Sequence, residues 1–314
     1  MASDAGKAAD ASGSSPPDAG IVTTACDQMR RIAERIAAAS PVPVFLMHVP
    51  TTWQTVAAHK MYLSELKRLG RFLVELGGRT PSNADLAAVM RDYDKARSVL
   101  RDSRGGLSAW RFSEAIAEFH RTNRTNRTNE TNRTYRTHWQ AVSEDGQNAR
   151  PAAGRPAAAS PAKAALARNV PLALVGGPLV LPHFDLFDLV ESAGGEIVLD
   201  ATESGERTLP APFDRRALGD DPLLSLAEAY FGTIPDAFRR PNSALYAYLK
   251  REIEARGVRG ILFRHYVWCD TWRAEAQRLK EWAGVPLLLI EVGDEDRIVG
   301  HEATRIASFL EMLK

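Results

Sequence analysis

The chain has 314 residues, of which 45% are hydrophobic and 25% charged, and its formal net charge is +1. This near-zero charge excludes the strongly basic surface of a nucleic-acid or anionic-lipid binder. No apolar run reaches the roughly 18 residues of a membrane span, and the first twenty residues lack the apolar core of a secretory signal. Two cysteines are too few for a disulfide framework, so we expect a soluble, cytoplasmic protein.

In chain order, residues 1–20 are mostly Ala, Ser, Gly, Asp and Pro, and we expect them to be disordered. Residues 21–120 are expected to form a truncated N-terminal α/β lobe followed by helices. Strands are predicted at GIVTT (20–24) and PVPVFLMHVP (41–50), on either side of a helix at 26–40. Three further helices are predicted at 53–76, from Ser82 or Asn83 past Leu100, and at 108–120.

Residues 121–166 form a low-complexity segment. It begins with tandem repeats of Thr, Asn and Arg (RTNRTNRTNETNRT) and continues as an Ala- and Pro-rich stretch, ARPAAGRPAAASPAKAA. Such a composition cannot bury a core and is typical of flexible insertions and linkers. We therefore interpret 121–166 as an insertion between two ordered parts.

Residues 167–314 alternate between strand and helix patterns and are expected to form a C-terminal α/β lobe. Strands are predicted at 170–177, 196–201, 258–268 and 285–292, and helices at 184–195, 222–231, 243–257, from Thr271, and at 303–313. This βαβ alternation is typical of a parallel sheet with helices on both faces.

The two cysteines occur in matching surroundings. Cys26 and Cys269 each follow a predicted strand, precede an aspartate and open a helix, and seventeen residues further on each reaches a proline before an apolar strand. The match indicates two α/β units of one plan, with each thiol at the carboxyl edge of its sheet, where α/β proteins bind ligands. The positive end of a helix would favour the thiolate there. The alternative, that both are small buried residues near helix starts, stays open.

A series of segments extends from Thr23 to the C-terminus, apart from 121–166. They are TTACDQMRR, HVPTTW, YLSELKRLGRFLVELGG, LVGGPL, DLVESAGGEIVLD, DPLLSLAEAYF, VRGILF, GVPLLLIEV and TRIASFLEML. In this order they resemble the 2-hydroxyacyl-CoA dehydratase and benzoyl-CoA reductase family. The Cys-Asp pairs before helices and the final TRIASFLEML are the most specific of these marks.

The resemblance implies a subunit of a heterodimer with a paralogous dehydratase subunit, each built from two Rossmann-like (flavodoxin-like) parallel-sheet lobes with intervening helices. It implies a [4Fe–4S] cluster held by three cysteines, and an ATP-dependent iron–sulfur activator protein that supplies an electron. The reaction would be a ketyl-radical dehydration of an (R)-2-hydroxyacyl-CoA, or a related acyl-CoA reduction. By motif, Cys26 corresponds to the second cluster ligand and Cys269 to the last.

This sequence departs from the family pattern in two places. The first cluster cysteine has no counterpart, and Asp236 stands where the resemblance implies a cysteine after the proline of TIPDAF. Three explanations stay open. The true start codon lies upstream; or two thiolates are supplemented by an oxygen or nitrogen ligand; or the chain is a cluster-poor subunit whose partner does the chemistry.

Four further residues are candidates for the site. His265 lies four residues before Cys269, so strand alternation would place both on one face and make His265 a substitute cluster ligand, or else a core histidine. Gly176 and Gly177 would let a CoA thioester approach the backbone, or form a tight turn. Arg305 would contact a CoA phosphate or thioester carbonyl, or a carboxylate at its helix start.

Together these features predict a subunit of a 2-hydroxyacyl-CoA dehydratase-like lyase or benzoyl-CoA reductase-like oxidoreductase. The alternative is a non-catalytic, cluster-poor subunit that binds its paralogue or an acyl-CoA. A weaker alternative is a thiol-based redox protein that uses the two cysteines.

Overall fold

The apolar segments of the C-terminal half fold into a four-stranded, all-parallel sheet of order β4-β3-β5-β6. The structure, a computed structural model, describes residues 17–122, 169–293 and 300–314. The strands are β3 (Val170–Gly176), β4 (Gly195–Thr202), β5 (Gly260–Tyr266) and β6 (Leu287–Val292). Each predicted C-terminal strand is therefore present, and the expectation of an α/β fold with a parallel sheet is confirmed.

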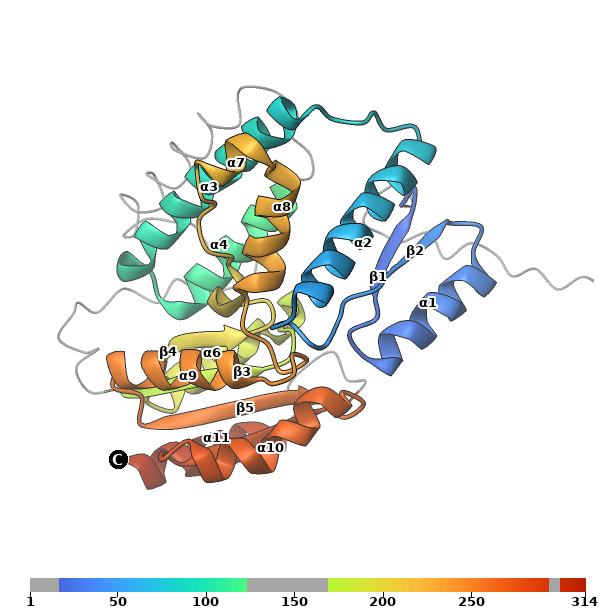
Figure 1. The fold of residues 1–314 in the computed structure, drawn as a ribbon. Helices are drawn as coiled ribbons and strands as arrows, with labels where there is room; N and C mark the ends of the chain where they lie inside the picture. Colours follow the sequence, from blue (N-terminus) through green and yellow to red (C-terminus); the bar gives the residue numbers. More distant parts are fainter. Residues whose placement is uncertain (1–16, 123–168, 294–299) are drawn as a thin grey trace, which may run out of the picture.

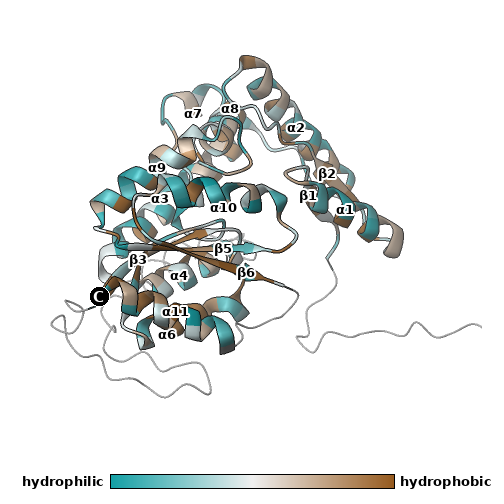
Figure 2. Cartoon of the chain, turned by 90° about the horizontal axis from the view of Figure 1, so that it is seen from below, coloured by the Kyte–Doolittle hydropathy of each residue, from teal (hydrophilic) through white to brown (hydrophobic). Residues whose placement is uncertain are grey.

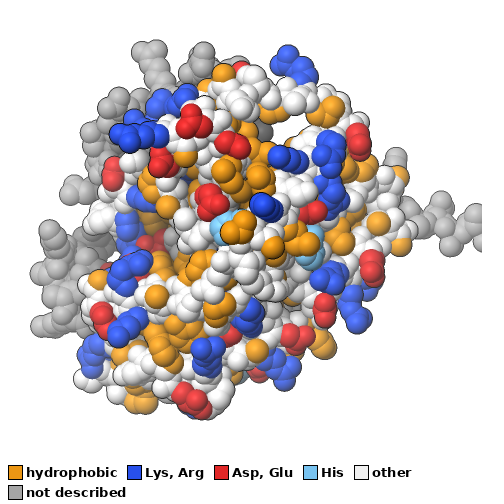
Figure 3. Space-filling model, in the orientation of Figure 1, with side chains coloured by type: hydrophobic (Ala, Val, Ile, Leu, Met, Phe, Trp, Pro, Cys, Tyr) orange, Lys and Arg blue, Asp and Glu red, His pale blue; other side chains and the backbone are white. Residues whose placement is uncertain are grey.

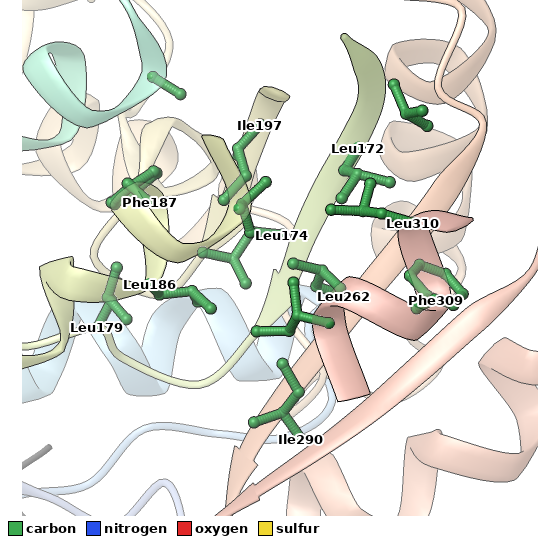
Figure 4. Close-up of a cluster of buried hydrophobic side chains, with 14 of the residues drawn as sticks. Leu172, Leu174, Leu179, Leu186, Phe187, Ile197, Leu262, Ile290, Phe309 and Leu310 are labelled. Atoms are coloured by element: carbon green, nitrogen blue, oxygen red, sulfur yellow. The ribbon is translucent and has the colours of Figure 1, made fainter. Parts of the chain in front are cut away.

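Helices cover both faces of this sheet, which explains why its strands are almost continuously apolar. Helices α9 (Ser243–Ala255) and α10 (Asp270–Trp282) lie on one face, whereas α4 (Ala109–Thr122), α6 (Asp185–Ser192) and α11 (Gly300–Leu313) lie on the other (Figure 2). Alternate strand residues point to opposite faces. Leu172, Leu174 and Leu262 pack on α6 and α11 (Figure 4), and Ala173, Val175 and Phe263 pack on α9 and α10.

Residues 17–76, which we call the N-terminal unit, form a smaller β-α-β-α arrangement. Strands β1 (Gly20–Thr23) and β2 (Val44–Met47) pair in parallel, with α1 (Asp27–Ala39) between them in sequence and α2 (Val56–Glu75) after them. Both predicted N-terminal strands are present. Two strands are too few to define a Rossmann-like lobe. That finer description of the N-terminal part stays a prediction.

A helical layer lies beside the N-terminal unit, with α8 (Pro222–Ala227) against α2, on the same side of the large sheet (Figure 1). It contains α3 (Asn83–Ser103), α7 (Ala217–Asp220), α8 and the π-helix Glu228–Gly232. Ser82 starts α3 through a capping box with Asp85, as its sequence position predicts. Short 3-10 turns complete the described elements at Arg104–Gly106, Leu181–Phe184 and Glu206–Thr208.

Helix α2 is the main contact between the N-terminal unit and this layer. It packs on α8 and on the π-helix, where Tyr62 stacks on Phe231 with ring centroids 4.7 Å apart. Its other side is largely open, because Met61, Leu73 and Val74 are 40–49% exposed. Figure 3 shows hydrophobic side chains at the surface between the positions of α8 and α2.

The predicted disorder of residues 1–20 and the predicted insertion at 121–166 fall mostly outside the described residues. Inside them, Gly20 is the first residue of β1, and α4 extends to Thr122. Ordered structure therefore reaches slightly into both ranges, and the proposed domain limits stay predictions. Within the described parts of the chain, no helix is long and apolar enough to cross a membrane.

Candidate functional site

The two cysteines come together from opposite ends of the chain. Cys26 is the N-cap residue of α1 and Cys269 the N-cap residue of α10. The beginnings of these two helices lie side by side (Figures 1 and 2), at the carboxyl edge of the large sheet. The thiols are near enough that the charge of Cys26 acts on the ionisation of Cys269. The arrangement has the location that the repeated Cys-Asp pattern predicts.

The ionisation of Cys269 differs from the sequence expectation. Burial is the largest influence and raises the pKa of this thiol, and the nearby charges of Glu203 and Cys26 raise the pKa further. The backbone N–H groups of Trp272 and Thr271, at the start of α10, act in the opposite direction. The start of α10 thus favours the thiolate, as the sequence position predicts, but partial burial outweighs this effect and the pKa of Cys269 is raised.

His265 supports the turn that carries Cys269. Its Nδ1–H donates to the Tyr266 carbonyl at 2.9 Å, and the same carbonyl accepts the Cys269 N–H at 2.9 Å. Strand β5 ends at Tyr266, so the strand alternation invoked for His265 and Cys269 does not extend to the cysteine. The Nε2 atom of His265 is buried without a hydrogen-bond partner among the described residues, 3.7 Å from Glu291 Oε1. A ligand role for His265 stays a prediction.

A carboxylate beside the thiols was not predicted from the sequence. Glu203 directly follows β4 at the carboxyl edge, and Trp272 Nε1 donates a hydrogen bond to its Oε1. Burial raises the pKa of Glu203 most, and the Asp236 charge raises it too, whereas the Arg207 charge and the Trp272 hydrogen bond lower it. The one signal in the sequence is the position of Glu203 after a buried strand.

Asp236 is already engaged by the protein. Its Oδ2 accepts a hydrogen bond at 2.9 Å from Nη1 of Arg207, whose side chain is fully buried. Arg207 also donates to the carbonyls of Ala201 and Pro235, and its guanidinium lies 5.3 Å from the centre of the Trp272 ring. At the position where the family resemblance implies a cysteine, this chain therefore has the carboxylate partner of a buried arginine.

The two glycines at the end of β3 have a reason within the fold. Gly176 has φ +140°, and a Cβ atom built on it would lie 1.8 Å from the carbonyl oxygen of Arg264 on β5. The Gly177 N–H donates to that same oxygen at 3.1 Å. The close approach is made by the neighbouring strand, which accounts for Gly176 without a ligand. Binding of a CoA thioester there stays a prediction.

Arg305 lies on α11 and contacts the edge strand β6. It is exposed, and its Nη2 donates at 2.6 Å to the carbonyl of Leu289. Leu289 belongs to β6, an edge strand whose outward carbonyls have no neighbouring strand within this sheet. The structure therefore gives Arg305 a partner that neither sequence interpretation included, and its proposed role toward CoA stays a prediction.

The residues present do not fit a complete [4Fe–4S] site. The sequence contains two cysteines, whereas such clusters are normally held by four thiolates, or by three with one open iron position. Among the residues that the structure describes, no group of three or more His, Cys, Asp or Glu side chains is placed to hold a metal ion. Asp236 is paired with Arg207, and His265 bonds the turn through Nδ1 while its Nε2 has no hydrogen-bond partner among the described residues, so the described side chains form no complete ligand set.

Fold and site define an α/β protein with a pair of thiols at the carboxyl edge of a parallel sheet. The chain belongs to the family described as 2-hydroxyglutaryl-CoA dehydratase, D-component, whose sequence model matches residues 1–313. The family resemblance stated from the sequence is thereby confirmed, and it associates the chain with subunits of 2-hydroxyacyl-CoA dehydratase-like enzymes. No curated protein matches the chain.

Proposed function

We propose that this chain is the cluster-poor subunit of a 2-hydroxyacyl-CoA dehydratase-like complex. In this proposal it binds a paralogous subunit that holds the iron–sulfur cluster, and it does not assemble a [4Fe–4S] cluster alone. The observation that carries the proposal is the thiol pair, to which the described residues add no third ligand. Cys26 and Cys269 lie together where the family pattern places two cluster cysteines, and no metal-binding group is formed around them by the described residues.

The Arg207–Asp236 ion pair supports the same interpretation. A buried guanidinium needs a carboxylate or equivalent acceptors, because an unpaired buried charge is strongly unfavourable. Arg207 Nη1 has that carboxylate at 2.9 Å, and the side chain of Arg207 is inaccessible to solvent. Asp236 thus stabilises the protein's own interior, which is a structural use of a position where the family resemblance implies a cysteine.

Substrate and location follow from the family and belong to the same proposal. The assembled complex would act in the cytoplasm on an acyl-CoA, with the ATP-dependent iron–sulfur activator as a further partner. This chain would contribute the carboxyl edge of its sheet to the shared site. At that edge Gly177 lies beside Trp272, and Cys269 is half-buried. The ketyl-radical dehydration, or a related acyl-CoA reduction, would take place at the cluster-bearing subunit.

Co-expression tests this proposal. We would express the tagged chain anaerobically with an untagged member of the same family that carries three cluster cysteines. The molar mass of the purified product would be measured by size-exclusion chromatography with light scattering. A stable one-to-one complex is expected, with iron bound to the untagged subunit. If the two chains elute separately at micromolar concentration, the proposed partnership is wrong.

A further inference from the structure

The thiol pair is suited to a chemistry that needs no metal. Cys26 and Cys269 are the two cysteines of the chain, both are free thiols, and both are half-buried, so each keeps access to small solutes. They are the N-cap residues of two helices whose beginnings lie side by side. Two thiols with no third metal ligand among the described residues either stay separate and unreactive or form a disulfide with each other.

The arrangement of the two thiols favours the shared use. Cys26 comes from the N-terminal unit and Cys269 from the large sheet, and the helices that they cap begin side by side at the carboxyl edge of that sheet. Cys269 lies in a turn held by two hydrogen bonds to the Tyr266 carbonyl. One thiol is thus held in a fixed turn, while the other approaches from a separate unit of the fold.

We propose that Cys26 and Cys269 form a reversible intramolecular disulfide by exchange with low-molecular-weight disulfides such as oxidised glutathione. In the first step the Cys26 thiolate attacks one sulfur of oxidised glutathione and releases one glutathione thiolate. In the second step the Cys269 sulfur attacks the Cys26 sulfur of the mixed disulfide and releases the second glutathione. One disulfide is broken and one is formed, and the two thiol protons pass to the two glutathione thiolates.

The disulfide would connect the N-terminal unit to the large sheet at a place other than the contacts made by α2. Within the N-terminal unit, α1 packs mainly on its own strands β1 and β2, whereas α2 makes the contacts with α8 and the π-helix. A disulfide between the starts of α1 and α10 would add a covalent link between the N-terminal unit and the large sheet. Oxidation would therefore restrict movement between these parts and change the carboxyl edge at which both thiols lie.

Redox titration of the full-length chain tests this inference. The purified, reduced, iron-free protein would be equilibrated anaerobically with increasing ratios of oxidised to reduced glutathione, then alkylated and mapped by mass spectrometry without reduction. The expected result is loss of both thiols in a single step and one peptide pair joined through Cys26 and Cys269. In Cys26→Ser and Cys269→Ser the remaining thiol should instead carry a glutathione mixed disulfide.

Three outcomes would overturn the inference, and none of them requires a variant to fold. Wild-type protein that collects only glutathione mixed disulfides, or that keeps both thiols free at every ratio, cannot form the shared bond. Disulfides between separate chains would count equally against it. The inference does not rest on the proposed function, because this readout needs no partner subunit, and a failed co-expression leaves the disulfide result unaffected.

Discussion

Replacing Gly176 by alanine should destabilise the protein strongly. The added Cβ would lie 1.8 Å from the Arg264 carbonyl oxygen, whereas real Cβ atoms essentially never come closer than 3.0 Å, so β3 and β5 would have to separate by roughly 1 Å. The φ of +140° adds backbone strain for any residue with a side chain. Overpacking and strain together should lower the free energy of unfolding by at least about 3 kcal/mol.

Urea and thermal unfolding, followed by circular dichroism, measure this effect. For a chain of 314 residues the loss corresponds to a melting temperature lower by roughly 5 °C. Gly105→Ala is the matched control, because its Cβ would have no neighbour within 4 Å and its φ is not positive. The control should change stability by no more than ~0.5 kcal/mol. A Gly176→Ala protein as stable as the control would refute the assigned contact with β5.

Three further changes have defined outcomes. Because burial and the Glu203 charge raise the pKa of Cys269, Glu203→Gln should shift the midpoint of iodoacetamide alkylation at Cys269 to lower pH, and an unchanged or higher midpoint would contradict this contact. Burial also raises the pKa of Asp200 above its unfolded value. The stability that protonated Asp200 contributes is therefore complete below the unfolded pKa of about 3.9, and it is lost as pH rises through the folded pKa. Asp200→Asn should accordingly lose less unfolding free energy than wild type between pH 4 and 8, and parallel curves would argue against that assignment. Ser82→Ala removes the capping box of α3 and should cost about 1 kcal/mol in denaturant unfolding, while no measurable loss would show that this cap is dispensable.

The strands and most helices were predictable because their signals are local. The run VPLALVG is continuously apolar and becomes the buried strand β3, and LLLIEV, apolar except for Glu291, becomes the partly buried edge strand β6. Ser82 likewise marks the start of α3. The helix predicted from Trp53 begins only at Val56, because Thr55 provides the N-cap. The π-helix at Glu228–Gly232 follows α8 without a distinctive pattern, and sequence periodicity does not separate the two.

The site was predictable in part. The repeated Cys-Asp pattern placed Cys26 and Cys269 at helix starts on a sheet edge, and the fold brings them together. Burial decides the pKa of Cys269, and burial depends on segments distant in sequence. The Glu203–Trp272 hydrogen bond and the Arg207–Asp236 ion pair also join separate elements, so spacing along the chain could not reveal them.

The most direct test of the account is the iron and acid-labile sulfide content of the isolated chain. The protein would be expressed and reconstituted anaerobically with excess iron and sulfide, beside Cys26→Ala and Cys269→Ala, and its visible spectrum recorded. A chain without a complete ligand set should retain far less than one [4Fe–4S] cluster and remain nearly colourless. A near-stoichiometric cluster in the wild type that disappears in both variants would contradict the cluster-poor assignment and make this chain itself the catalytic subunit.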